Sequence, residues 1–140
     1  MINGGLLRDA VISAAHSISN KKKSVDELNV FPVPDGDTGT NMSMTITNSV
    51  AELENLSDDT DCSVVASTTA SALLRGARGN SGVILSLIFR GFAKGLERKK
   101  EMGANELVES LEQGKWSERE SRCPHLCYEG FDRRCAPCGR

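Results

Sequence analysis

The chain has 140 residues, of which 26% are charged and 4% are aromatic, and its formal net charge is -2. This charge balance gives no basic field to attract nucleic acid, and so few aromatic side chains offer no stacking surface for single strands. The apolar runs fall short of the roughly 18 residues that a membrane helix needs, and the N-terminus lacks a signal-peptide core, so we expect one small domain in the cytoplasm.

Apolar residues recur at helical spacing along most of the chain. The first predicted helix begins with Leu7 and ends near Asn20, and the lysines at 21–23 are interpreted as a solvated connector. Later helices are predicted from the stripe over Met42–Leu53, from 62–74, from 83–96 and from 104–113. No segment alternates convincingly as a strand would. The predicted fold class is therefore all-α.

The segment Asn29-Val-Phe-Pro-Val-Pro-Asp-Gly-Asp-Thr-Gly-Thr-Asn-Met42 carries an acidic pair directly before the second helix. Asp35 and Asp37 are two residues apart, so in extended backbone their side chains leave on the same side. Hard carboxylate oxygens of this kind suit Mg²⁺, which takes one or two protein carboxylates together with water and substrate phosphates. The residues Thr38, Gly39, Thr40 and Asn41 then offer short polar caps and bare amides where phosphate is favoured. The local chemistry predicts a site for metal and phosphate.

Other interpretations of this motif differ in strength. An EF-hand loop begun at Asp35 would need glycine and glutamate where Thr40 and Ile46 stand, so it is excluded. A nucleophilic aspartate at Asp37 would normally follow a buried strand, which Pro32 and Pro34 disfavour. A plain turn with an Asp or Thr cap remains open.

A second glycine-bearing loop, Gly76-Ala-Arg-Gly-Asn-Ser-Gly82, separates two predicted helices. Gly76 fits a helix C-cap, and Asn80 or Ser81 fits the N-cap of the next helix. The loop would expose amides at a helix start, with Arg78 within reach of an anion. It lacks the Gly-Lys-Ser/Thr ending of a P-loop. A simple hinge between helices is the alternative, but two such loops together favour a shared nucleotide site.

The last 26 residues, 115–140, have a different composition and carry four of the five cysteines. Cys123, Cys127, Cys135 and Cys138, with His125, are a nominal zinc set, although the first pair has loose spacing and little apolar sequence surrounds the set. We expect a frameshifted or foreign tail, disordered in solution. A zinc module and disulfides are the alternatives, and the latter are disfavoured because cytoplasmic thiols stay reduced.

The blocks 29–42 and 76–86, followed by Phe89-Arg-Gly-Phe92, resemble the N-terminal nucleotide-binding domain of bacterial fatty acid kinases, in the dihydroxyacetone kinase L-domain family. The resemblance covers 1–114, which we take as a partial ATP-binding domain, with 115–140 as the tail. It implies an antiparallel helical barrel or bundle, here incomplete, that binds ATP through Mg²⁺. It also implies that Asp35 and Asp37 are metal ligands and catalytic residues, with Asn29 near a further ligand position. The implied nucleotide-binding residues are Thr38, Gly39, Thr40, Asn41, Gly79, Asn80 and Ser81.

The activity that this resemblance implies is phosphorylation of a fatty acid presented by a separate carrier protein; a homodimer is also allowed. Three alternatives stay open. The first is a non-catalytic fragment that binds nucleotide or a partner protein. The second is a subunit of a dihydroxyacetone-type (glycerone) kinase, and the third is a zinc-binding regulator built on the tail.

Overall fold

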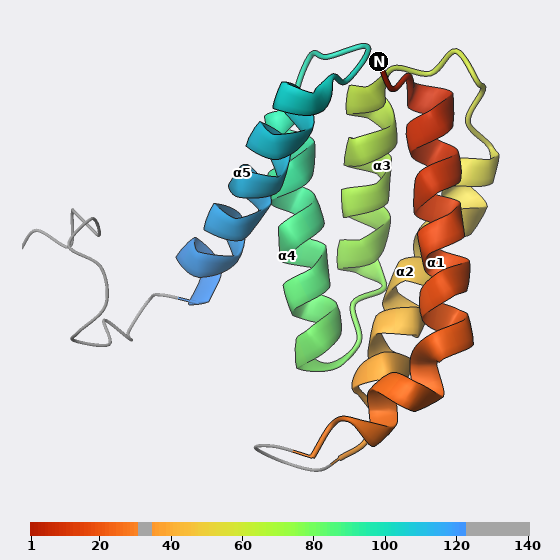
Figure 1. Ribbon diagram of the computed structural model, residues 1–140, viewed down its shortest axis with the longest axis vertical. Helices are drawn as coiled ribbons and strands as arrows, with labels where there is room; N and C mark the ends of the chain where they lie inside the picture. The colour runs from red at the N-terminus through yellow and green to blue at the C-terminus, as the bar shows by residue number, and fades with distance from the viewer. Residues whose placement is uncertain (31–34, 123–140) are drawn as a thin grey trace, which may run out of the picture.

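The computed structural model describes residues 1–30 and 35–122 of the chain. This part contains the helices α1 (Gly4–Glu27), α2 (Thr38–Glu54), α3 (Cys62–Arg75), α4 (Gly79–Gly95) and α5 (Ala104–Arg122). Successive helices run in opposite directions, and α1 and α5 lie at opposite edges of the bundle (Figure 1). The all-α fold class predicted from the sequence is confirmed, since the described residues form no strand beyond one bridge between Ile2 and Met102.

Two apolar clusters hold the helices together. The larger one joins α1, α2, α3, α4 and the connection from α4 to α5. Its buried members are Leu7, Val11, Leu53, Cys62, Val65, Ala66, Phe92, Leu96 and Met102. The smaller cluster has three buried members, Ala15, Ile46 and Leu73. Phe89 packs against both clusters and so connects them.

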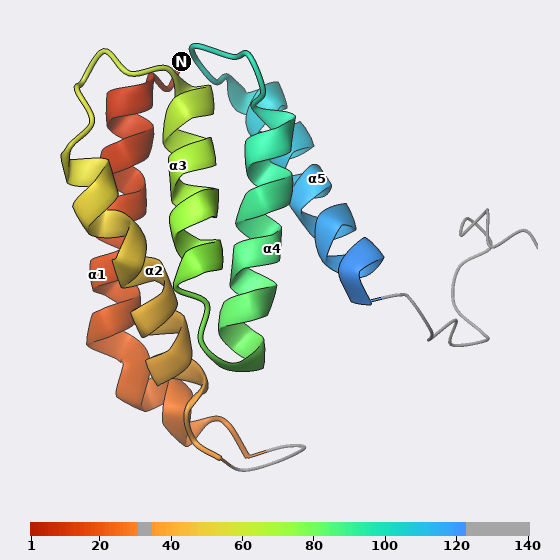
Figure 2. The ribbon, with the colours of Figure 1, turned by 180° about the vertical axis from the view of Figure 1, so that it is seen from behind.

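The connection from α1 to α2 and the connection from α3 to α4 lie at the same end of the bundle, which we call the loop end (Figure 1). The other two connections and the N-terminus lie at the opposite end, and the view from behind shows the same arrangement (Figure 2). The antiparallel helix order therefore brings both motif-bearing loops to one end of the molecule.

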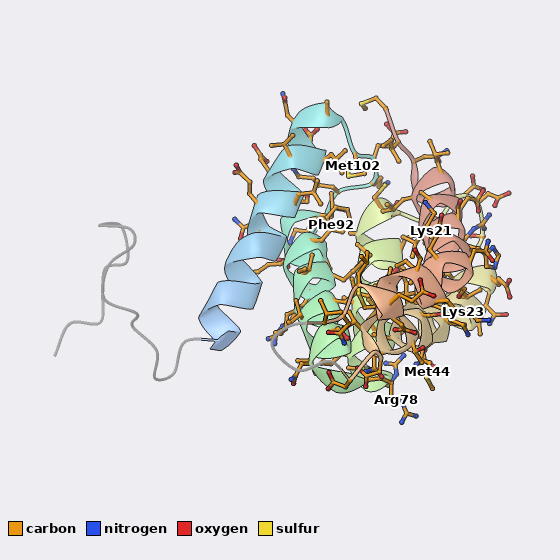
Figure 3. The ribbon with its side chains drawn as sticks, turned by 60° about the horizontal axis from the view of Figure 1, so that its bottom comes forward. Lys21, Lys23, Met44, Arg78, Phe92 and Met102 are labelled. Carbon is orange, nitrogen blue, oxygen red and sulfur yellow. The ribbon has the colours of Figure 1, made fainter. Side chains whose placement is uncertain are left out.

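The first helix is longer than predicted. It continues to Glu27, so the three lysines at 21–23 belong to α1 and are not a connector. Lysine is a good helix former, and these side chains occupy an exposed part of the helix surface, seen for Lys21 and Lys23 in Figure 3. Val25, seven residues after Ile18, returns a half-buried apolar side chain to the same face.

The last helix is also longer than the predicted 104–113, because α5 extends to Arg122. It packs along α4, where Gly91 and Gly114 allow close approach of the two backbones. A methyl group at Gly91 would lie 2.3 Å from the carbonyl oxygen of Gln113. The boundary predicted after Gly114 thus falls inside a helix, although the division into domain and tail stays a prediction.

None of the helices in residues 1–30 and 35–122 combines the length and the apolar character needed to cross a bilayer.

Candidate functional site at the loop end

The acidic pair stands immediately before α2. Asp35, Gly36 and Asp37 are all exposed, and Gly36 has a positive φ of 62°. Only glycine adopts that backbone region readily. Asp37 is the N-cap residue of α2, but its side chain makes no capping hydrogen bond. Its carboxylate therefore makes no hydrogen bond to the first turn of α2, so Asp37 is not the Asp cap that the plain-turn interpretation assumed.

The start of α2 is capped from another helix. Asp26, in the last turn of α1, accepts a hydrogen bond of 3.0 Å from the Thr40 amide through Oδ1 and one of 2.7 Å from the Thr40 hydroxyl through Oδ2. These bonds, the hydroxyl first, hold the pKa of Asp26 below its ordinary value. The amide of Thr40, which the sequence predicted to be bare, thus already has an anionic partner.

The helix that follows the second loop, α4, begins two or three residues earlier than predicted. Gly76 is the C-cap of α3, as expected, but α4 begins at Gly79 with Arg78 as its N-cap residue. The predicted N-caps Asn80 and Ser81 instead lie in the first turn of the helix. The prediction failed because Gly79 has a positive φ of 59°, which turns the chain into the helix without a side-chain cap. Amides in the first turn of a helix have no intrahelical acceptor, so they are suited to an anion.

A row of polar side chains on α2 joins the two loops. Asn41, Thr45 and Asn48 share one face of the helix, since they are four and three residues apart. The Thr45 hydroxyl accepts a 3.0 Å hydrogen bond from the Arg78 amide and donates one of 2.7 Å to the Asn41 carbonyl. The Asn48 side-chain amide donates to the carbonyl of Gly76 at 3.3 Å.

Glycines opposite this row make room for it. Methyl groups at Gly76, Gly79 and Gly82 would lie 1.8 Å from Asn48 Nδ2, 2.5 Å from Asn41 Nδ2 and 2.3 Å from Thr45 Oγ1, respectively. We call the three pairs the Asn/Thr–Gly ladder. It brings the predicted residues Asn41 and Gly79 into contact, so the first turns of α2 and α4 lie side by side.

The remaining predicted residues surround this contact. Asn29 is half-buried in the turn after α1, where its amide donates to the Asp26 carbonyl at 3.1 Å. Arg78 is exposed, and its side chain extends from the loop end in Figure 3. It is a cation at the edge of the site, available to a phosphate.

Asp26, Thr45 and Asn48 were missed from the sequence. For Thr45 and Asn48 a signal was present, since they continue the helical face of Asn41 beside the apolar stripe. Asp26 gave no local signal, because it lies 14 residues before Thr40, whereas a capping residue normally stands just before its helix.

The donor set fits Mg²⁺ bound together with a phosphate. Within residues 1–30 and 35–122, no three acidic, imidazole or thiol side chains gather as a complete metal cage. Two exposed carboxylates are what Mg²⁺ uses when water and substrate phosphate fill its other positions. The nominal zinc residues Cys123, His125, Cys127, Cys135 and Cys138 lie outside the described residues.

These observations define an all-α domain that presents an acidic pair and two adjacent helix starts at one end. The chain belongs to the DAK2 domain family, whose model matches residues 32–124. The DAK2 domain is the ATP-binding domain of the dihydroxyacetone kinase family. The match includes all but the first three residues of the acidic motif, the whole of the second loop and all of α5.

Curated relatives resemble this chain over most of its length. It is 51% identical over 114 residues to an uncharacterized protein of Staphylococcus epidermidis. It is 47% identical over 113 residues to Protein YloV of Bacillus subtilis and 49% identical over 113 residues to an uncharacterized protein of Staphylococcus aureus. These alignments cover 81% of this chain and 20% of each relative. The chain therefore spans about a fifth of the length of these relatives.

Proposed function

We propose that this chain is the Mg-ATP-binding part of a fatty acid kinase, which makes an acyl phosphate from a carrier-bound fatty acid. The single observation that supports the nucleotide site best is that two different aspartates supply the capping bonds and the N-cap residue of α2. Asp26 caps the helix, so Asp37, at the N-cap position, keeps its carboxylate for another partner. That partner would be Mg²⁺ bound together with a phosphate, and membership in the DAK2 family supports ATP as the molecule that carries the phosphate.

In this proposal the residues of the chain bind and orient. Asp35 and Asp37 would hold Mg²⁺, and the first-turn amides of α4 at Gly79, Asn80 and Ser81 would orient phosphate oxygens. Bound Mg²⁺ would neutralise negative charge on the phosphates. The resemblance implies that Asn29, in the turn after α1, lies near a further ligand position.

The acceptor is proposed from its chemistry. A fatty carboxylate, with a pKa of roughly 4–5, is already ionised at neutral pH and needs no general base. A hydroxyl acceptor such as dihydroxyacetone would need more help in losing its proton. At the loop end of the described bundle, the proposal assigns Asp35 and Asp37 to Mg²⁺, and the amides and Arg78 beside them accept no proton at neutral pH. The carrier protein and a homodimer stay predictions that go with the resemblance, and a cytoplasmic location stays a prediction from the sequence.

Calorimetric titration of ATP, with and without Mg²⁺, tests the nucleotide site. Wild-type protein should bind ATP only with Mg²⁺, and Asp35→Ala/Asp37→Ala should abolish binding. The matched control is Glu54→Ala/Asp59→Ala, which removes two exposed acids outside the loop end and should bind normally. Equal binding by wild type and Asp35→Ala/Asp37→Ala would refute the site.

Phosphate transfer separates the kinase from a non-catalytic binding module. The protein should convert γ-labelled ATP and a carrier-bound fatty acid into acyl phosphate, which hydroxylamine traps as a hydroxamate. ATP binding without transfer would leave a nucleotide-binding module, while transfer to dihydroxyacetone alone would identify a glycerone kinase.

A further inference from the structure

The residue Asp26 does more at the loop end than an ordinary helix cap. Its two oxygens accept separate bonds from the amide and the hydroxyl of Thr40, so the carboxylate fixes the direction as well as the position of the first turn of α2. It comes from α1, so the bonds tie the end of one helix to the start of the next. The bonds therefore hold the helix turn that directly follows Asp35 and Asp37.

Close packing of α1 and α2 supports this contact. A methyl group at Gly39 would lie 2.3 Å from the Lys22 carbonyl oxygen, so the two backbones approach closely beside Asp26. The turn after α1 is held as well, because the amide of Asn29 donates to the Asp26 carbonyl. Asp26 thus contacts Asn29 through its backbone carbonyl and Thr40 through its side chain.

We propose that Asp26 is the positioning residue of the aspartate pair, which holds the start of α2 so that Asp35 and Asp37 are directed toward a shared cation. This inference rests on the proposed function, in which that pair binds Mg²⁺. Both Asp26 oxygens are occupied by Thr40, which favours positioning over direct ligation of the metal. Asp26 therefore acts on Asp35 and Asp37 indirectly, through the position of Thr40.

Manganese binding, followed by electron paramagnetic resonance on the full chain, tests the inference with Mn²⁺ as the probe. Residues that orient metal ligands typically change affinity by about 10–100-fold when removed. Asp26→Ala should therefore weaken Mn²⁺ binding about tenfold or more. Thr40→Val, which removes only the hydroxyl bond, should weaken Mn²⁺ binding less than Asp26→Ala does. Thr40→Ser, which keeps the hydroxyl, should bind Mn²⁺ as wild type does. The double variant Asp26→Ala/Thr40→Val should bind no worse than Asp26→Ala, because both changes break the same contact.

Two controls match these substitutions. Glu27→Ala removes the neighbouring exposed acid of α1, and Thr47→Val removes a hydroxyl that donates within α2 to Ser43. Both should bind Mn²⁺ within twofold of wild type. Amide hydrogen exchange gives a readout that needs no metal: the Thr40 amide should exchange faster in Asp26→Ala than in either control.

The outcomes separate this inference from the proposed function. If Asp35→Ala/Asp37→Ala loses Mn²⁺ while Asp26→Ala binds as wild type does, the positioning role is wrong and the metal site stands. If wild type binds no Mn²⁺, the proposed function fails and this inference fails with it. An unchanged Thr40 exchange rate in Asp26→Ala also overturns the contact. If Asp26→Ala does not fold, Thr40→Val carries the test, and an effect no larger than that of Thr47→Val overturns the inference.

Discussion

At the start of α2, two aspartates fill the two roles that a single N-cap residue has in most helices. Asp37 occupies the N-cap position, but Asp26 of the preceding helix supplies the hydrogen-bonding carboxylate. A carboxylate near a helix N-terminus is stabilised by the helix dipole as well as by its hydrogen bonds. The ionised form of Asp26 is therefore favoured in the folded protein.

This contact predicts a specific pH dependence. The pKa of Asp26 lies below its ordinary value of 3.8, mainly because of the Thr40 hydroxyl and amide. A lowered folded-state pKa contributes stability above the unfolded-state value, and that contribution is lost as the pH falls through the folded-state pKa. Asp26→Asn, which resembles the protonated acid, should have a lower Tm than wild type at neutral pH. The two should converge in acid below the ordinary pKa.

Thermal melts of both proteins from neutral pH to acid would measure this difference. Glu27→Gln removes a neighbouring charge without a comparable contact and should follow wild type at every pH. A constant gap between wild type and Asp26→Asn across the whole range would show that the hydrogen bonds, not the charge, carry the effect.

Among the helices, the α4–α5 contact depends most clearly on small residues. A methyl group at Gly91 would lie 2.3 Å from a backbone oxygen of α5, and one at Gly95 would lie 2.6 Å from the Cα of Ser110. Neither backbone can yield as a flexible side chain could. The two helices are therefore held at a separation that only glycine permits.

Gly91→Val should force α5 away from α4. Overpacking a close contact commonly costs about 1–3 kcal/mol, and displacement of a backbone is at the upper end of that range. Urea denaturation would measure the loss, and Lys94→Val, an exposed position on the same helix, is the control for β-branching. Equal stability of Gly91→Val and wild type would mean that α5 does not pack here.

The sequence predicted the existence of the helices better than their ends. The stripe of Ile46 and Leu53 is buried as expected, because a 3.6-residue period directly reports the face of a helix that meets the core. The ends of α1 and α5 were missed, since lysines favour a helix and a single glycine opposes one only weakly when a neighbouring helix supplies the packing. At the loop end, the sequence correctly predicted that Asp35 and Asp37 stand directly before α2 and that the second loop separates α3 from α4, while their roles stay predictions. The Asp26–Thr40 bonds could not be predicted, because they depend on how two helices meet.

At the scale of the whole molecule, apolar packing among residues 1–30 and 35–122 is unevenly divided between the two ends of the bundle. The larger cluster has nine buried members, whereas the smaller, which includes Ile46 and Leu73, has three. Asn/Thr–Gly contacts replace apolar packing at the loop end. Hydrogen bonds contribute less net stability than apolar burial of similar extent.

We therefore expect the loop end to open more readily than the rest of the described bundle. Native-state hydrogen exchange should show lower protection in the second turns of α2 and α4, whose amides have helical partners, than around Val65 and Leu96. Mg²⁺ and ATP together should raise protection at the loop end if the proposed site is correct. Uniform protection along α2 and α4 without ligand would contradict the uneven packing.

The Asn/Thr–Gly ladder also has a consequence for inheritance and for engineering. Each polar side chain fills the volume that its glycine leaves vacant, so a larger residue at Gly76 or Gly82 is tolerated only with a smaller one at Asn48 or Thr45. Such pairs should change together during divergence. A mutant library that randomises the second loop alone would then contain mainly chains in which this loop cannot pack against α2. A library that varies the loop and the facing residues of α2 together would retain folded members.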